Sequence, residues 1–201
     1  MQPPEFIQTA RLTLRRLALA DAEAIFTAYA QDTEVTRFLT WRPHQRIKDT
    51  RAFIRQQSAA WDAGAEFTWA IRRKDGEVIG GIALRPQGCK VDFGYVLARA
   101  HWGNGFAAEA LQALVDWALA QAGVYRAWAV CDVENAASAR VLEKVGMTRE
   151  GILRRWLRHP QAGDTPRDCL CYSIVRASDR PPAPPPSTKS AAGPPQGETA
   201  P

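Results

Sequence analysis

The segment over 91–122 constrains the fold more than any other part of the sequence. Its first part, Val91–Leu97, has the composition of a strand, and a Gly103-Asn104-Gly105 turn follows after five linking residues. A helix is predicted over about 104–122, because apolar side chains repeat at helical spacing there and Gly123 supplies a C-terminal stop. A strand, a glycine turn and a helix in this order favour an α/β domain.

The rest of the chain supports the same fold class. Alternating or β-rich runs predict the other strands, an Asp-Gly pair predicts a hairpin turn, and possible capping residues mark the starts of further helices. The predicted strands are 11–15, 67–72, 78–84, 126–131, 149–157 and 169–175; the predicted helices begin at Asp21, after Asp49 and at Asn135; the hairpin turn is 74–77.

Length and composition suggest one ordinary folded domain. The chain has 201 residues, and we expect a domain over 1–177. The segment 178–201 holds eight prolines, no aromatic residue and no apolar residue larger than alanine. Such a segment buries too little surface to offset its ordering entropy, so we expect a disordered tail.

Composition also sets expectations about partners and location. No apolar run is long enough to cross a membrane and no signal peptide is visible, so we expect a cytoplasmic protein without membrane contact. The net charge of +5 suits an anionic ligand but also reflects an arginine-rich composition. We expect no nucleic-acid partner, although Arg154–Arg158 is basic, and no metal, because the cysteines and histidines lack ligand spacing. The oligomeric state is expected to be a monomer or a homodimer.

The glycine turn indicates a site for a diphosphate. Glycines let backbone N–H groups turn toward a ligand, and a helix start offers unpaired donors and a positive dipole end. The alternative interpretation is an ordinary helix entry with two incidental turn glycines. Two ligand classes fit the turn: a nicotinamide dinucleotide and coenzyme A.

The dinucleotide hypothesis would make the chain an NAD-binding oxidoreductase. Gly103-x-Gly105-x-x-Ala108 matches the glycine fingerprint, and Asp132 ends the next predicted strand. The motif lies mid-chain, however, and leaves too little sequence for a six-stranded nucleotide domain. Asp132 also follows Gly103 by 29 residues, where about 20 are expected for a ribose-binding acid.

The coenzyme A hypothesis rests on a family resemblance. Three segments in the right order resemble the GNAT acetyltransferase superfamily, and within it the branch of ribosomal-protein-alanine N-acetyltransferases. The segments are Thr9–Arg15, Trp102–Ala110 and Asn135–Met147. The resemblance implies an α/β fold with a mixed, mostly antiparallel central sheet, splayed central strands and about four flanking helices. It also implies acetyl-CoA as cosubstrate.

The resemblance assigns expected cofactor contacts. Backbone amides of the turn would hold the pyrophosphate, and the end of the preceding strand would pair with the pantetheine arm. The expected contacts are Val96, Leu97, Trp102, Gly103, Asn104, Gly105, Phe106, Ala107, Asn135 and Ser138. Trp102 stands where many members of the superfamily have Gln or Arg, which alters one pyrophosphate contact.

The implied chemistry is direct attack of an amine on the thioester, which needs a base and a proton donor. Asp92 and Glu134 are the candidate bases, although Asp92 is equally interpreted as a solvent-facing strand residue. Leu142 stands where many members place a tyrosine that protonates the thiolate. Ser138 is therefore the candidate acid, and its alternative role is in the first turn of a helix.

The sequence leaves the acceptor open. Phe38, Trp41 and His44 lie in a segment that suits an acceptor pocket, although packing or surface exposure is the more ordinary role for them. The branch resemblance favours a protein N-terminal α-amine, and small-molecule amines are the other class. A non-catalytic CoA-binding sensor is the main rival hypothesis, and the missing tyrosine at Leu142 supports it.

Overall fold

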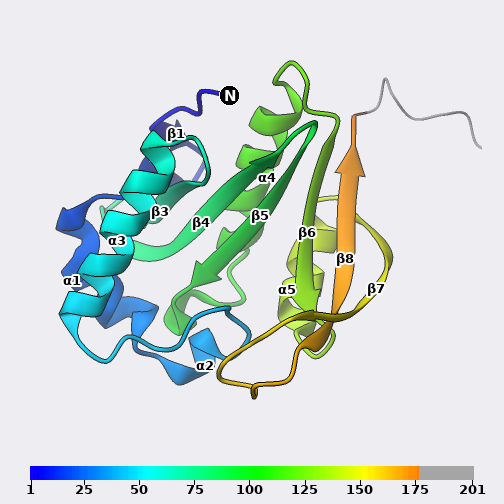
Figure 1. Cartoon of the computed structure of the whole chain (residues 1–201). Helices are drawn as coiled ribbons and strands as arrows, with labels where there is room; N and C mark the ends of the chain where they lie inside the picture. The colour runs from blue at the N-terminus through cyan, green and yellow to red at the C-terminus, as the bar shows by residue number, and fades with distance from the viewer. Residues whose placement is uncertain (177–201) are drawn as a thin grey trace, which may run out of the picture.

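An eight-stranded sheet runs through the part of the chain that the computed structural model describes, residues 1–176 (Figure 1). Its spatial order is β1-β2-β3-β4-β5-β6-β8-β7. The strands are β1 (Phe6–Gln8), β2 (Leu12–Arg16), β3 (Phe67–Arg73), β4 (Val78–Gln87), β5 (Lys90–Leu97), β6 (Arg126–Asp132), β7 (Thr148–Leu157) and β8 (Arg167–Val175). The predicted tail, 178–201, lies outside the described residues.

The two central strands meet only at one end. Every neighbouring pair in the sheet is antiparallel except β5 and β6, which pair in parallel over Lys90–Asp92 and Arg126–Trp128. Beyond Asp92 and Trp128 the strands separate, so the rest of β5 has no partner on that side. The mixed, mostly antiparallel sheet with splayed central strands is therefore confirmed.

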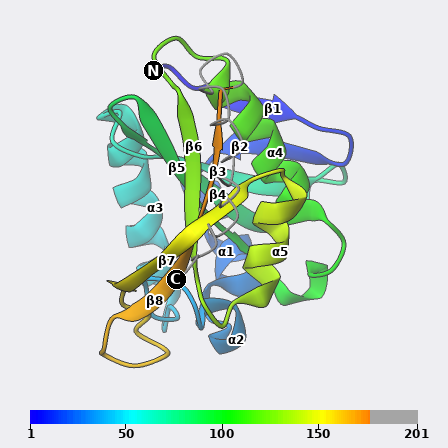
Figure 2. The ribbon, with the colours of Figure 1, turned by 90° about the vertical axis from the view of Figure 1, so that its right-hand side faces the viewer.

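Helices cover both faces of the sheet (Figure 2). Five α-helices occur in residues 1–176: α1 (Ala22–Ile25), α2 (Thr33–Thr36), α3 (Ile47–Asp62), α4 (Phe106–Leu119) and α5 (Ala136–Lys144). α1 and α3 pack on one face, against β3 and β4, whereas α4 and α5 pack on the other, against β5, β6 and β7. The helices α1 and α3 and the helix α4 that follows the predicted phosphate turn therefore lie on opposite faces of the sheet.

The core explains why the sheet and α4 form. The apolar stripe of α4 is fully buried, with Leu111, Leu114, Val115 and Ala118 each 0% exposed. These side chains pack in one cluster with strand residues from β2 to β6. Burial of this stripe anchors α4 on the sheet, so the residues at the start of the helix need not pack in the core and can form a binding site.

Some predicted boundaries were wrong for local reasons. α4 begins at Phe106 rather than 104, because Gly105 adopts a left-handed φ of 78° that ends the turn before the helix starts. The helix predicted from Asp21 to Ala30 begins as a 3₁₀ turn at Leu19 and ends as a wide π turn over Phe26–Ala30. β1 and α2, of three and four residues, were not predicted.

The hairpin prediction is confirmed. Gly76 has a φ of 91°, and its amide donates to Arg73 at 2.9 Å, which closes the turn between antiparallel β3 and β4. Within residues 1–176, no helix has the length and apolar character needed to cross a membrane.

Candidate active site

Two adjoining cavities lie where β5 and β6 separate. One, of about 520 Å³, runs along the glycine turn and the first turns of α4 and α5, and we call it the turn cavity. The other, of about 350 Å³, lies between the splayed strands and the N-terminal helices, and we call it the strand cavity. Six residues line both cavities and so mark their junction: Phe38, Leu39, Tyr95, Val96, Asn135 and Ser138.

The glycine turn has the geometry of an anion site. Gly103 and Gly105 both have a φ of 78°, a conformation that side chains rarely adopt. A Cβ added at Gly105 would lie 3.3 Å from Lys144 Nζ and 3.5 Å from Arg11 Nη2. Two cations and the N-terminus of α4 therefore meet at one backbone position, and all three favour a bound phosphate.

Glu109 connects the turn to the start of the chain. Its Oε1 accepts from the Thr9 hydroxyl at 2.6 Å and the Arg11 amide at 2.8 Å, and its Oε2 accepts from Arg11 Nε at 2.6 Å. Arg11 Nη1 also donates to the Asn104 carbonyl at 3.0 Å. Burial raises the pKa of Glu109, but the hydrogen bonds from Thr9 and Arg11 lower it by more. The pKa therefore lies below its ordinary value, and the carboxylate stays ionised.

Nine of the ten predicted cofactor contacts line the turn cavity: Val96, Leu97, Trp102, Gly103, Gly105, Phe106, Ala107, Asn135 and Ser138. Asn104 does not line it; its side chain donates back to the Trp102 carbonyl at 3.0 Å. The indole of Trp102 donates to the Leu97 carbonyl at 2.7 Å. The Leu97 carbonyl thus already has a partner, and the Val96 carbonyl faces β4, where a Cβ added at Gly80 would lie 2.3 Å from it. Because backbone groups alternate sides along a strand and the Ala98 amide bonds Ile79 of β4, the Leu97 amide is the better candidate for pairing with an extended ligand.

Ser138 lies in the first turn of α5, where Asn135 is the N-cap, as predicted. The Asn135 side chain accepts from the Ser138 amide at 3.1 Å, so the cap does not use the serine hydroxyl. That hydroxyl lies 2.7 Å from the hydroxyl of Tyr95, which also donates to the Ser138 carbonyl at 3.2 Å. Ser138 Oγ is therefore not used by the helix cap and is paired with Tyr95 at the junction of the two cavities.

Tyr95 was not among the predicted site residues. Burial raises its pKa above the ordinary value of 10, although the hydrogen bond with Ser138 lowers it, so the phenol stays protonated at neutral pH. It occupies β5 next to Val96, a residue that was predicted. The alternation of residues along a predicted strand does not show which helix the Tyr95 side chain will contact. Only the folded structure shows that it reaches Ser138 of α5.

Asp92 is buried, at 8% exposed, rather than solvent-facing. Its carboxylate accepts from Arg85 Nε at 2.8 Å and from Gln87 Nε2 at 2.8 Å, and a second Arg85 nitrogen contacts it. Arg85 also pairs with Glu66 at 3.0 Å. Asp92 lines the strand cavity, but its oxygens are already held by this network.

Glu134 lies on the other side of the junction, in the turn cavity. Its side chain is 56% exposed and forms an ion pair with Arg167 at 2.8 Å, whereas Arg37 lies further away at 3.7 Å. The two predicted bases therefore occupy different cavities and different environments. Within residues 1–176, no group of three His, Cys, Asp or Glu side chains is placed to hold a metal ion.

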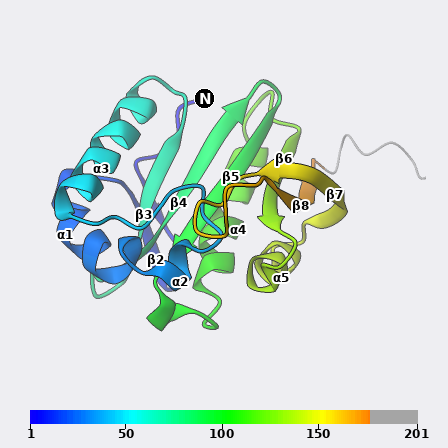
Figure 3. The same ribbon diagram turned by 60° about the horizontal axis from the view of Figure 1, so that its bottom comes forward.

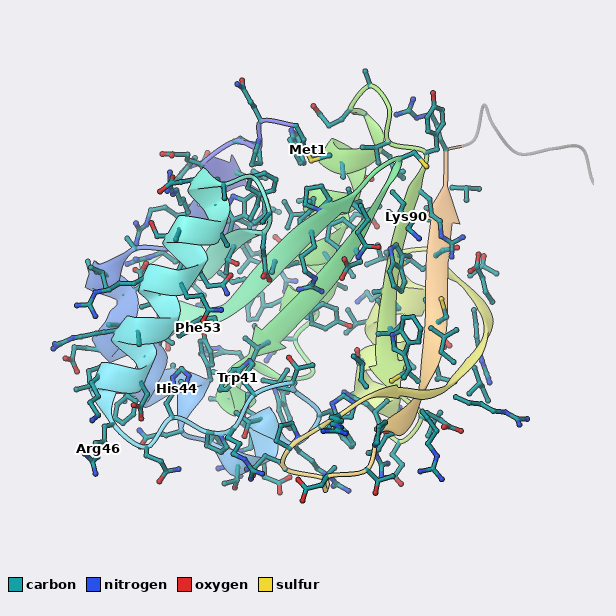
Figure 4. All side chains as sticks on the ribbon, in the orientation of Figure 1. Met1, Trp41, His44, Arg46, Phe53 and Lys90 are labelled. Carbon is teal, nitrogen blue, oxygen red and sulfur yellow. The ribbon has the colours of Figure 1, made fainter. Side chains whose placement is uncertain are left out.

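The predicted acceptor residues Phe38, Trp41 and His44 all line the strand cavity. Trp41 and His44 lie beside Phe53 of α3 (Figure 4), with ring centroids 5.0 Å apart for Trp41–His44 and 6.2 Å apart for Trp41–Phe53. His44 Nδ1 is 2.8 Å from the Thr50 hydroxyl, and burial lowers the pKa of His44. Phe38 lines both cavities and contacts the ring of His159 edge-on at 6.3 Å.

Two loops border the same end of the site. The segment between α2 and α3 and the loop between β7 and β8 lie side by side there (Figure 3). They contact each other through the Phe38–His159 pair and through Arg42 and Asp164, 3.9 Å apart. Residues from both loops line the strand cavity.

A buried thiol in the strand cavity is poorly suited to act as a nucleophile. Cys131 of β6 is 5% exposed and lines the cavity. Burial raises its pKa to about 11, so the thiol is neutral near pH 7.

Comparison with known proteins identifies a family with this arrangement. A family model described as acetyltransferase (GNAT) domain matches residues 11–148. YoaA, an uncharacterized N-acetyltransferase of Bacillus subtilis (strain 168), is 35% identical over 174 residues, covering 85% of this chain and 96% of YoaA.

Solved structures have the same fold. A GNAT-family acetyltransferase from Bacillus anthracis superposes with a TM-score of 0.74 at 26% identity, covering 85% of this chain and 98% of that one. RimL, a ribosomal L7/L12 α-N-protein acetyltransferase solved in complex with coenzyme A, superposes with a TM-score of 0.75 at 21% identity, covering 87% and 100%.

Proposed function

The chain belongs to the GNAT acetyltransferase family, and from this premise we propose that it transfers an acetyl group from acetyl-CoA to a primary amine by direct attack. The observation that carries the proposal is the junction of the two cavities at Ser138 and Tyr95. A donor bound in the turn cavity and an acceptor bound in the strand cavity would meet there.

The turn cavity fits coenzyme A chemically. A diphosphate suits the left-handed turn at Gly103 and Gly105, where Lys144 and Arg11 add positive charge beside the start of α4. Val96 and Leu97 lie on the part of β5 that β6 does not pair with, and the Leu97 amide, which faces the gap, would bond an extended pantetheine arm. The NAD hypothesis has less support, because a dinucleotide domain needs a parallel sheet and only one strand pair within residues 1–176 is parallel.

The residues at the junction suit the departure of a thiolate. Acetyl-CoA supplies the activated acyl group. When the amine attacks the thioester carbonyl carbon, the carbon–sulfur bond breaks and the sulfur needs a proton. Ser138 Oγ would donate it, and the protonated phenol of Tyr95 would resupply the serine. Because a free thiol has a pKa of about 8.5, only modest help is required.

We further propose that the acceptor is a protein N-terminal α-amine. The likeness to RimL, described as an α-N-protein acetyltransferase, supports this acceptor. An α-amine has a pKa of about 7.7–8.0, against about 10.4 for lysine, so it needs less help to become neutral. Asp92 and Glu134 stay the predicted bases, with Phe38, Trp41 and His44 predicted to contact the acceptor. The cytoplasmic location and the choice between monomer and homodimer also stay predictions.

The decisive experiment measures coenzyme A release and acetylated product from the purified full-length chain. Acetyl-CoA would be offered with peptides that begin with alanine or serine, matched Nα-blocked peptides that keep a lysine, and a panel of small amines. We expect product with free α-amines and none with the Nα-blocked peptides. Product only with small amines would refute the protein acceptor. Tight acetyl-CoA binding by calorimetry without any turnover would instead identify a CoA-binding sensor.

A further inference from the structure

His159 is buried in the strand cavity without a hydrogen-bond partner. It lies in the loop between β7 and β8, lines the cavity and is 2% exposed. Neither of its ring nitrogens has a hydrogen-bond partner among residues 1–176. Because a buried polar group without a partner is costly, such a group in a cavity indicates that a ligand or water completes its hydrogen bonding.

Asp132 gives this imidazole a fixed negative neighbour. His159 Nε2 lies 3.5 Å from Asp132 Oδ2, within reach of charge attraction but outside hydrogen-bond geometry. Phe38, from the segment after α2, packs on the ring edge-on and brings no charge. The ring is thus held between an aromatic side chain and a carboxylate.

Asp132, the carboxylate beside His159, is itself held in place by a network of hydrogen bonds. Asp132, at the end of β6, accepts from Arg167 of β8 at 2.6 and 3.0 Å and from the Glu134 amide at 2.9 Å. Burial raises the pKa of Asp132, but these hydrogen bonds lower it by more. The pKa therefore lies below its ordinary value, and the Asp132 carboxylate stays ionised. Arg167 also pairs with Glu134. Two carboxylates share one guanidinium, and Arg37 lies 3.7 Å from the exposed Glu134 where solvent screens it.

The inference rests on the proposed acetyl transfer: we propose that His159 accepts the proton that the acceptor ammonium must lose, directly or through one water, with Asp132 stabilising the imidazolium. The free ring nitrogens, the position in the strand cavity beside Asp132, and the shared cavity lining with Ser138 carry the proposal.

The proton balance of this step closes. One ammonium proton moves to a His159 nitrogen, and the freed lone pair attacks the thioester carbonyl carbon. The carbon–sulfur bond breaks, and the thiolate takes a proton from Ser138, which Tyr95 resupplies; the attacking nitrogen gives its second proton back to this hydroxyl pair. His159 then returns its proton to solvent, so the products are the amide, the free thiol of coenzyme A and one proton.

His159 is better placed for this role than the two acids predicted from sequence. Asp92 has its oxygens occupied by Arg85 and Gln87, and Glu134 is exposed and paired with Arg167. Within residues 1–176 both ring nitrogens of His159, by contrast, have no hydrogen-bond partner, so either can accept from the ammonium or from a bridging water. Either acid can still tune the site by charge.

The test compares H159Q with the full-length wild type over pH 6–9.5, using acetyl-CoA and an alanine-initiated peptide. We expect kcat/KM to fall about 100-fold at pH 7, mostly through kcat. We expect the loss to shrink below about tenfold at pH 9, where the α-amine is already neutral. D132N should show the same pH pattern with a smaller loss. A loss that stays constant across pH, or one below about twofold, would overturn the proposal.

H44Q is the matched control, because His44 lines the same cavity but its ring is bonded to the Thr50 hydroxyl. It should change the peptide KM and keep the wild-type pH profile. If H159Q does not fold, ring-nitrogen NMR of wild type decides, since the chain has only three histidines. Peptide bound to the CoA complex should perturb the His159 signals, and unchanged signals would contradict the proposal. A wild type inactive on every amine overturns the proposed function itself, whereas an active wild type with an unaffected H159Q overturns only this role.

Discussion

The hydroxyl of Tyr95, on β5, lies 2.7 Å from the hydroxyl of Ser138, on α5. This contact links β5 to α5 where β5 and β6 separate, and both residues line both cavities. The pair offers a protonated hydroxyl relay at a position where Leu142, fully buried, provides no donor.

Removing the serine hydroxyl tests this relay. S138A keeps the backbone amide that the Asn135 cap needs, so the helix start should be unaffected. We expect kcat to fall about tenfold, equivalent to about 1.4 kcal/mol of transition-state stabilisation, while the Kd for CoA measured by calorimetry stays within twofold. Y95F should give a smaller loss in kcat. If S138A weakened CoA binding as much as it lowered kcat, the hydroxyl would be a binding group instead.

The contact between Arg11 and the glycine turn predicts a different phenotype. Arg11 bonds Glu109 and the Asn104 carbonyl, and its guanidinium lies 4.5 Å from the Phe106 ring centroid. R11A should therefore loosen the turn and remove a cation beside Gly105. We expect the Kd for CoA to rise about tenfold, with kcat at saturating acetyl-CoA nearly unchanged.

The control for R11A is R51A. Arg51 pairs with Glu23 at 3.0 Å on the surface and lines neither cavity. Equal losses of CoA affinity in both variants would show that the effect is general charge attraction and not the geometry of the turn.

Local patterns predicted the elements that carry the site but not the contacts between them. The hairpin at Gly76 and the stripe of α4 follow from short-range rules, and both are confirmed. α2 is only four residues long, although Asp32 caps it by accepting from two amides, a signal present in the sequence. Short elements like this depend on tertiary packing, which periodicity does not register.

The contacts that complete the site join residues far apart in sequence. Thr9 and Glu109 are separated by 100 residues, and Tyr95 and Ser138 by 43. The resemblance placed Thr9, Glu109 and Ser138 in separate motifs without indicating that Thr9 and Glu109 bond each other. Only the folded structure shows that the first motif bonds the second, because a contact between a strand and a distant helix leaves no periodic pattern in the sequence.

Glu150 gives a pH-dependent prediction for stability. Hydrogen bonds from Arg126 lower its pKa from the ordinary 4.5 to about 2, and Ser173 adds another at 2.6 Å. A carboxyl with a depressed folded-state pKa stabilises the protein above pH 4.5, and that contribution is lost as pH falls through about 2. Because Glu150 is partly exposed, the contribution should not exceed about 1 kcal/mol.

Urea unfolding of wild type and E150Q from pH 7 down to pH 3 measures this contribution. The difference in unfolding free energy should be largest above pH 4.5 and shrink below it. In an R126M background the E150Q substitution should have little effect at any pH, since the partner is gone. A difference that grew on acidification would contradict the assigned direction.

The close approach of β4 to β5 beside Val96 predicts a local backbone constraint. A Cβ added at Gly80 would lie 2.3 Å from the Val96 carbonyl oxygen and 3.2 Å from Leu97 Cα. G80A must therefore push the end of β5 outward, at the residues proposed to pair with the pantetheine arm. We expect a loss of about 1–3 kcal/mol in stability together with weaker CoA binding. Thermal unfolding and calorimetry measure the two effects separately.

G151A is the control, because a Cβ there meets no atom within 4 Å, and it should leave CoA binding unchanged. Wild-type CoA affinity in folded G80A would show that the end of β5 does not bind the arm.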